Sequence, residues 1–171
     1  MTLWLRAAVY AVLFVFLSLQ VVRGETCILP TETTDPILIS ISYDEPQGMV
    51  FELDINALQS LPLESFDTST IWTDGIQTFQ GVRLKVMLDC LNVESGVLTL
   101  IAQNDYSVEI PYDEIDEKGQ LLAFARNGDL MTLRDKGPIW LVYPYDQNPI
   151  YQTEKAYSRS IWQLDSIIIS R

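Results

Sequence analysis

The chain has 171 residues, of which 48% are hydrophobic and 20% charged, and its formal net charge is −12. This length leaves room for one domain, and such acidity disfavours nucleic acid and anionic membrane surfaces as partners, because both are bound through clustered Lys and Arg. The sequence contains no histidine, which excludes Ser-His-Asp and Cys-His catalytic sites and imidazole metal sites.

The N-terminal segment has the pattern of a secretory signal peptide. Arg6 precedes the apolar run Ala7–Val22, and the small residue Gly24 follows it closely. We therefore predict a signal peptide at residues 1–24 and a periplasmic or secreted protein. An uncleaved anchor is the alternative, but the run is near the lower limit of the ~17–25 residues that cross a bilayer. Cleavage leaves a domain at residues 25–171 with 9 basic and 23 acidic side chains, a net charge of −14 and no further membrane span.

Two cysteines, Cys27 and Cys90, would enter an oxidising compartment, where disulfides persist. A bridge between them would close a loop of about 60 residues and stabilise the fold by ~4 kcal/mol. Cys90 also falls on the apolar side of a predicted helix, where a free cysteine behaves as a small buried hydrophobe. The sequence leaves the disulfide and the free thiols open.

The first elements of the predicted domain are two strands and a short helix. Apolar and serine residues alternate over Pro36–Tyr43, which predicts a strand with one buried face. Glu45–Gly48 reads as a turn, and Met49–Leu53 is the partner strand. Asp54 is placed to cap a short helix over Ile55–Ser60.

Next come two short extended segments and a second helix. We predict the extended segments over Thr68–Trp72 and Ile76–Phe79, on either side of a turn. The helix follows Gly81, and Arg83 is expected on its outer, solvent-facing side. Its apolar stripe has the spacing i, i+3, i+4, i+7. The stripe consists of Leu84, Met87, Leu88 and Leu91.

The second half of the chain reads as a series of short strands separated by turn residues. The Asn127-Gly128 pair is a strong hairpin signal, and Tyr145–Ser160 is polar, aromatic and weakly helical. Many strands with few helices predict a mixed, β-dominated α+β domain. The predicted strands are Gly96–Ala102, Tyr106–Ile110, Leu121–Ala125, Leu130–Leu133, Ile139–Tyr143 and Ser166–Ser170.

Several blocks in the same order resemble the molybdopterin-binding domain of the sulfite oxidase type. The leading block is Phe79-x-Gly81-Val82-x-Leu84. The resemblance implies a single domain with the sulfite oxidase-type molybdopterin-binding fold, clearest over residues 66–171. The further blocks are Asn104–Pro111, Leu121–Gly128, Gly137–Pro144 and Trp162–Ile167.

The chain departs from this family where the family binds its metal. The enzymes hold molybdenum through a cysteine that lies shortly before the glycine of the leading block, and here that position reads Thr68-Ser69-Thr70. A hydroxyl is a poor substitute for a soft thiolate ligand. Lys136 replaces a family glycine, and Trp140 stands near a family arginine. We therefore expect no bound molybdenum, with molybdopterin binding as the alternative.

The resemblance indicates a candidate cofactor cleft but no catalytic residue and no metal ligand. Trp72 would either offer an aromatic surface to a ligand or close the emptied cavity. The basic residues would hold an anionic ligand or pair with the abundant carboxylates. The candidate residues are Thr68, Ser69, Thr70, Trp72, Arg126 and Lys136.

The predicted function is that of an exported binding or sensory module. Its partner would be an unknown small ligand or a membrane-bound periplasmic protein. One alternative is a molybdopterin-dependent oxidoreductase with an oxygen ligand from Ser69 or Thr68. The other is a structural interaction domain.

Overall fold

The computed structural model describes residues 27, 29, 33–45 and 48–171, so the predicted signal peptide lies outside the described residues. Within that part, no helix combines the length and the apolar character needed to cross a membrane. The strands are β1 (Ile39–Tyr43), β2 (Val50–Leu53), β3 (Leu63–Ser69), β4 (Ile76–Arg83), β5 (Val97–Ala102), β6 (Ser107–Pro111), β7 (Leu121–Arg126), β8 (Asp129–Leu130), β9 (Trp140–Val142) and β10 (Leu164–Ser170). The helices are α1 (Ile55–Gln59), α2 (Leu84–Cys90) and α3 (Glu154–Ser158), with 3-10 turns at Tyr112–Glu114, Leu133–Asp135 and Pro149–Tyr151.

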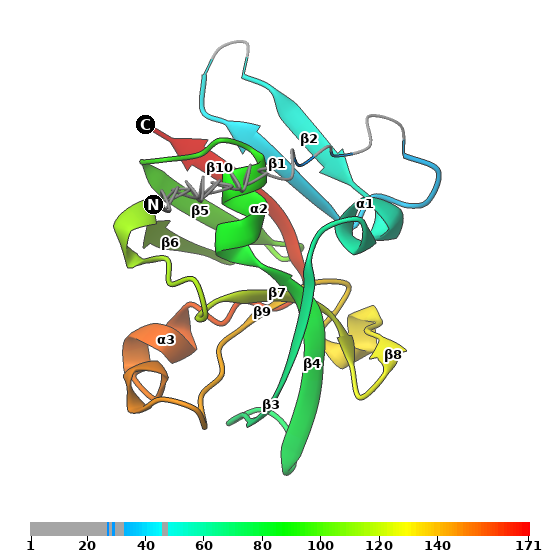
Figure 1. Cartoon of the computed structure of the whole chain (residues 1–171), viewed down its shortest axis with the longest axis vertical. Coiled ribbons are helices and arrows are strands. Elements are labelled where there is room, and N and C mark those ends of the chain that lie inside the picture. The colour runs from blue at the N-terminus through cyan, green and yellow to red at the C-terminus, as the bar shows by residue number, and fades with distance from the viewer. Residues whose placement is uncertain (1–26, 28, 30–32, 46–47) are drawn as a thin grey trace, which may run out of the picture.

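The strands form two five-stranded sheets. This confirms the prediction of a β-dominated domain. One has the order β2-β1-β10-β5-β6, in which β1 and β10 are parallel. The other has the order β3-β4-β7-β8, with β9 also paired to β7. In Figure 1 the first sheet lies at the top, and the long hairpin of β3 and β4, which belongs to the second sheet, extends to the bottom. Helices α1 and α2 lie beside the first sheet, whereas α3 lies at the lower left.

The burial pattern of each strand follows its place in a sheet. In β5 every second residue is buried, because one face of its sheet packs on the core and the other does not. In β7 five consecutive residues, Leu121–Ala125, are buried, since this strand is central and covered on both faces. The polar and apolar alternation in the sequence therefore predicts the first sheet better than the second.

Gly81 lets β4 and β7 approach each other. The pairing of these two strands shifts between Gln80 and Gly81, an irregularity typical of a β-bulge. A Cβ atom at Gly81 would lie 2.0 Å from the carbonyl oxygen of Leu122. Glycine is required there because any side chain would push the two strands apart.

Asp54 caps α1, as predicted. Its carboxylate accepts hydrogen bonds from the backbone N–H of Ala57 at 2.8 Å, Thr34 at 3.1 Å and Asp35 at 3.3 Å. These donors lower the pKa of the carboxyl, the bond from Ala57 being the largest cause. The cap thus ties the start of the domain to α1.

Two local predictions were wrong, and the segment Tyr145–Ser160 agrees with the weak helical tendency expected there. The extended segment predicted over Thr68–Trp72 belongs to the longer strand β3, which ends at Ser69. The strand predicted over Leu130–Leu133 is only the short β8 followed by a 3-10 turn. Tyr145–Ser160 contains the helix α3, capped by Thr153, whose hydroxyl accepts from Ala156 N–H at 3.2 Å.

Arg83 is also misplaced by the sequence pattern, because it is buried rather than on an outer helical face. Its Nε donates to Glu64 at 2.8 Å, and its Nη1 donates to the carbonyl oxygens of Lys118 at 2.7 Å and Gly119 at 3.0 Å. The guanidinium carbon lies 5.0 Å from the centroid of the Phe66 ring. Arg83 thus connects β3 and β4 to the loop before β7.

The buried residues form two clusters. The larger one lies between the sheets and the helices α1 and α2. The smaller one, which we call the second core, is packed on the β3–β4–β7 sheet. Trp72 packs against both clusters, and Trp162 packs against the second core. The second core consists of Phe66, Phe79, Leu121, Ala123, Met131, Trp140 and Val142.

The structure joins Cys27 and Cys90 in a disulfide whose Cα atoms are 5.2 Å apart. The bridge fixes the start of the domain to the last residue of α2. The two cysteines are 63 residues apart in the sequence, so the bridge closes a long loop.

Removal of this bridge should destabilise the domain through the unfolded chain, which gains conformational freedom. We expect the Cys27→Ser, Cys90→Ser double variant to lose ~4 kcal/mol of unfolding free energy. Denaturant unfolding of both proteins, with and without dithiothreitol, measures this. The reductant should destabilise the wild type and leave the variant unchanged. Equal midpoints for oxidised wild type and variant would contradict the expectation.

Candidate functional site

Four of the six predicted cleft residues, Thr68 to Thr70 and Trp72, lie at the end of β3 and in the turn toward β4. Thr68 is buried, and Ser69 and Thr70 are partly buried. The hydroxyl of Thr70 accepts a hydrogen bond from the backbone N–H of Trp72 at 3.1 Å and lies 2.8 Å from the hydroxyl of Thr73. These bonds fix the turn that carries the Trp72 ring.

Asp146 forms hydrogen bonds with Ser69 and Thr68, the residues that the sequence resemblance aligns with the family cysteine. The hydroxyl of Ser69 donates to Asp146 Oδ1 at 2.8 Å, and the Ser69 backbone N–H donates to Oδ2. The hydroxyl of Thr68 accepts from the Asp146 backbone N–H at 3.1 Å. The hydrogen bonds from Ser69 lower the pKa of the Asp146 carboxyl, the backbone bond more than the hydroxyl bond. The last residue of β3, Ser69, is therefore held by the carboxylate of Asp146.

These residues do not match the thiolate donor that the resembling enzymes use for molybdenum. The groups at the strand end are two hydroxyls and a carboxylate, which are hard oxygen donors. Both hydroxyls are already held by Asp146. The two cysteines are joined to each other in the disulfide, so neither offers a thiolate.

Trp72 is the centre of an aromatic cluster. Its ring centroid lies 5.7 Å from that of Trp162, 5.9 Å from Trp140, 6.0 Å from Tyr157 and 6.4 Å from Tyr145. The interplanar angles are between 65° and 83°, so Trp72 meets each neighbour edge to face. Such contacts stabilise aromatic pairs beyond the area that they bury.

A cavity of about 310 Å³ opens beside this cluster. This volume is at the lower end of the ~300–1,000 Å³ that small-ligand sites occupy. We call it the aromatic cavity. It is lined by Trp72, Ala102, Asn104, Tyr106, Tyr157, Ser158, Ser160, Ile161 and Trp162.

Hydrogen bonds hold the walls of the aromatic cavity in place. Tyr106 donates from its hydroxyl to the carbonyl oxygen of Ser158 at 3.1 Å. Ser160 donates from its hydroxyl to the Ala156 carbonyl at 2.7 Å, so the Tyr145 hydroxyl donates to Ser160 Oγ. Burial raises the pKa of the Tyr145 hydroxyl above its ordinary value.

Lys136 packs on the outer side of the same cluster. Its Nζ lies 4.1 Å from the centroid of the Trp162 ring and 5.5 Å from that of Trp140. Burial lowers the pKa of the Lys136 ammonium, and the positive charge of Arg126 lowers it further. Arg126 itself lies 3.6 Å from a carboxylate oxygen of Asp135. Neither basic residue lines the aromatic cavity.

The structure thus brings together only part of the predicted cleft. Trp72 and Lys136 meet through the Trp162 and Trp140 rings, whereas Thr68 and Ser69 face Asp146. Sequence reasoning missed Asp146, because more than seventy residues separate it from its partners. It also missed the cavity walls Tyr106 and Tyr157, for which the only signal is the aromatic content of the chain, 11% of its residues.

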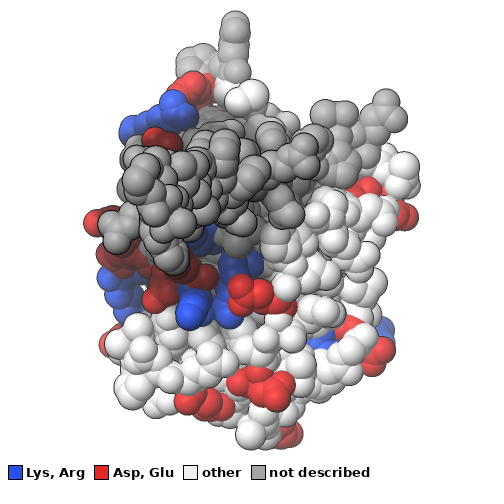
Figure 2. Space-filling model, viewed as in Figure 1, with Lys and Arg blue, Asp and Glu red and all other residues white. Residues whose placement is uncertain are grey.

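The basic residues elsewhere pair largely with carboxylates. Lys155 and Arg159 both contact Glu114, with Arg159 at 2.5 Å. These two contacts lower the pKa of Glu114, the hydrogen bond from Lys155 being the larger cause. On the face in Figure 2, the basic side chains stand mostly beside acidic ones rather than in a separate patch. The described residues visible on this face therefore form no extended basic patch.

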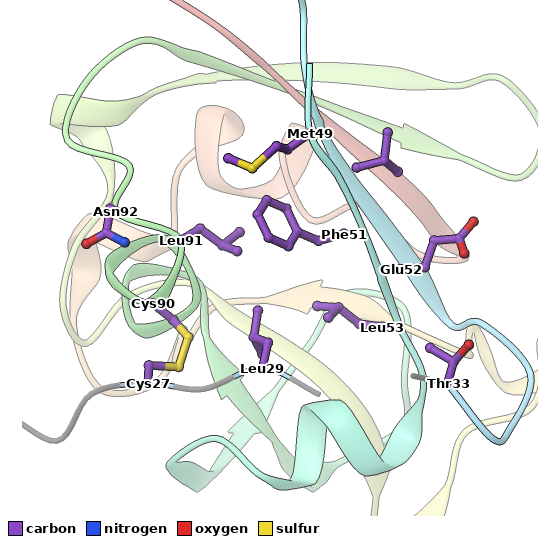
Figure 3. Close-up of a pocket in the computed structure, with 11 residues that line it drawn as sticks. Cys27, Leu29, Thr33, Met49, Phe51, Glu52, Leu53, Cys90, Leu91 and Asn92 are labelled. Atoms are coloured by element: carbon purple, nitrogen blue, oxygen red, sulfur yellow. A yellow bond between two sulfur atoms is a disulfide. The ribbon is translucent and has the colours of Figure 1, made fainter. Parts of the chain in front are cut away.

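A larger cavity of about 830 Å³ lies beside the disulfide. Figure 3 shows Leu29, Phe51, Leu53 and Leu91 converging in it, with the Cys27–Cys90 bridge on one side. Its walls are mainly aliphatic, and its border adjoins residues outside the described part of the chain. We therefore place the candidate site at the aromatic cavity, which has well-defined rings and hydrogen-bonded walls.

Comparison with known proteins supports the fold and nothing finer. No protein-family model matches the chain, and no curated protein matches it significantly. Among solved structures, it is similar to the sulfane dehydrogenase SoxCD from Paracoccus pantotrophus, with a TM-score of 0.57 and 16% sequence identity. The match covers 83% of this chain and 40% of the SoxCD chain. At this identity the likeness concerns the fold alone.

The hydrogen bonds that Ser69 donates to the Asp146 carboxylate predict a pH-dependent contribution to stability. The folded-state pKa of Asp146 is lowered, so the contribution is complete above the ordinary aspartate pKa of ~3.9 and is lost as the pH falls below it toward the folded-state value. We expect Asp146→Asn to be less stable than wild type at pH 7. Thermal melts at pH 7 and at lower pH should show the difference shrinking in acid. A difference that does not change with pH would contradict this role.

Proposed function

We propose that this chain is an exported small-ligand binding or sensory domain that has the sulfite oxidase-type molybdopterin-binding fold and works without molybdenum. The observation that carries the proposal is the aromatic cavity beside Trp72, next to a strand end that Asp146 closes. Its ligand would occupy the cavity and signal to a membrane-bound or soluble periplasmic partner.

The fold assignment rests on two independent supports. The motif blocks from Phe79 onward follow the order expected for that family. The similarity to the sulfane dehydrogenase structure covers most of the chain. Export is supported by the signal-peptide pattern at residues 1–24 and by the pairing of Cys27 with Cys90, which suits an oxidising compartment.

The absence of molybdenum chemistry is supported by the donor set. A molybdopterin-dependent oxidoreductase would have to use the oxygen of Ser69 or Thr68 as its metal ligand. Both hydroxyls are bound to Asp146, whose negative charge would also oppose an anionic pterin phosphate nearby. A domain that binds a small molecule without a metal needs no such metal-ligating side chain.

Metal and pterin analysis of the protein, purified as the cell exports it, tests this proposal against the oxidoreductase. We expect neither molybdenum nor pterin fluorescence in stoichiometric amount. Stoichiometric molybdenum would overturn the proposal. The Ser69→Cys variant is the matched control, because it restores the family donor and shows whether a thiolate at this position is enough to retain the cofactor.

Thermal shift measurements separate a binding module from a structural interaction domain. A small molecule that binds only the folded state raises the melting temperature with its concentration. We expect such a shift from a compound that enters the aromatic cavity, and we expect Trp162→Leu to abolish it. A screen over apolar, aromatic, cationic and sugar compounds without any shift would favour the structural domain.

A further inference from the structure

We propose that the aromatic cavity binds a quaternary ammonium group and that the ligand of this domain is a small compound that carries one. The inference rests on the binding function proposed above and adds the chemical class of the ligand. It follows from the arrangement of the rings, from the polar groups in the walls and from the charges around the cavity.

The rings of the cavity meet at steep angles. The Trp72 ring makes an angle of 69° with Trp162 and 83° with Tyr157, with centroids 5.7 Å and 6.0 Å apart. Rings at such angles form a corner rather than a parallel slot. A flat aromatic ligand stacks on one face of a corner, whereas a rounded trimethylammonium group contacts several rings at once.

Several oxygen acceptors of the walls are already engaged within the protein. Asn104 Oδ1 accepts from the Tyr106 backbone N–H at 3.2 Å, and the Ser158 carbonyl accepts from the Tyr106 hydroxyl. The Ser160 hydroxyl is bonded on both sides, to Tyr145 and Ala156. A primary ammonium needs several free hydrogen-bond acceptors, but a quaternary ammonium needs none.

The charges of the cavity lining give no support to an anionic ligand. The residues that line the cavity include no acidic and no basic side chain, so an anionic ligand would meet no counter-charge there. The acidic chain attracts cations over long range. Moreover, Trp162 already holds the Lys136 ammonium 4.1 Å from its ring centroid, outside the cavity lining. The ring is thus placed where an ammonium is stabilised by cation–π attraction.

Calorimetric titration with tetramethylammonium chloride and with choline tests the proposal, with sodium chloride as the salt control. The decisive comparison is the neutral choline isostere in which carbon replaces nitrogen. We expect choline to bind roughly tenfold or more tightly than the isostere, because only the cation gains from the ring faces. Equal binding of the two would overturn the proposal and leave the binding function intact.

Failure of the binding function itself gives a different result. In that case choline, the isostere, indole and glucose would all fail to bind and to raise the melting temperature. If indole or glucose bound and choline did not, the proposed binding function would stand and the proposed ligand class would be wrong. The three outcomes are therefore distinguishable in one panel.

Variants of Tyr157 provide a matched test of the ring. Tyr157→Leu removes an aromatic wall and should weaken choline binding roughly 5- to 30-fold, whereas Tyr157→Phe keeps the ring and should preserve it. Melting temperatures of both variants check that the fold is retained. Lys136→Met removes a neighbouring positive charge and should tighten choline binding while leaving the isostere unchanged. Equal choline affinity in the Leu and Phe variants would contradict the proposal that the Tyr157 ring binds the quaternary ammonium group.

Discussion

The position of the Trp72 ring is the constraint on which the rest of the site depends. The ring packs against both buried clusters and meets four other aromatic rings edge to face. The turn that carries it is fixed from one side by Thr70 and Thr73 and is anchored through Ser69 to Asp146. One ring thus fills the junction of the two cores and forms part of the wall of the neighbouring cavity.

The fold of this chain is similar to that of a sulfane dehydrogenase structure, and its candidate site is described by its own residues. Within the fold, Gly81 permits the close approach of β4 and β7. Around Ser69 lie hydroxyl groups and the carboxylate of Asp146, which are oxygen donors. Lys136 packs on the rings of Trp162 and Trp140. The strand end and the aromatic cluster are thus held by separate sets of contacts.

Local patterns in the sequence predicted much of the fold and little of the site. The alternation in β1 and β5, the Asp54 cap and the stripe of α2 are short-range properties, and the structure confirms them. Arg83 was misplaced because its partners Glu64, Lys118 and Gly119 come from other elements. Contacts of this kind, like the one between Ser69 and Asp146, arise from topology and leave no periodic signal. The sequence could indicate Trp72, but not the rings around it.

The central claim is that Trp72 and Trp162 form a ligand-binding corner. Nitrogen-edited NMR of the indole N–H groups tests it most directly, with each signal assigned by a Trp→Phe variant. The account predicts that tetramethylammonium chloride, relative to sodium chloride, shifts the Trp72 and Trp162 signals saturably and leaves the signal of the buried Trp140 nearly unchanged. Signals that do not move, or that all move linearly as with added salt, would contradict it.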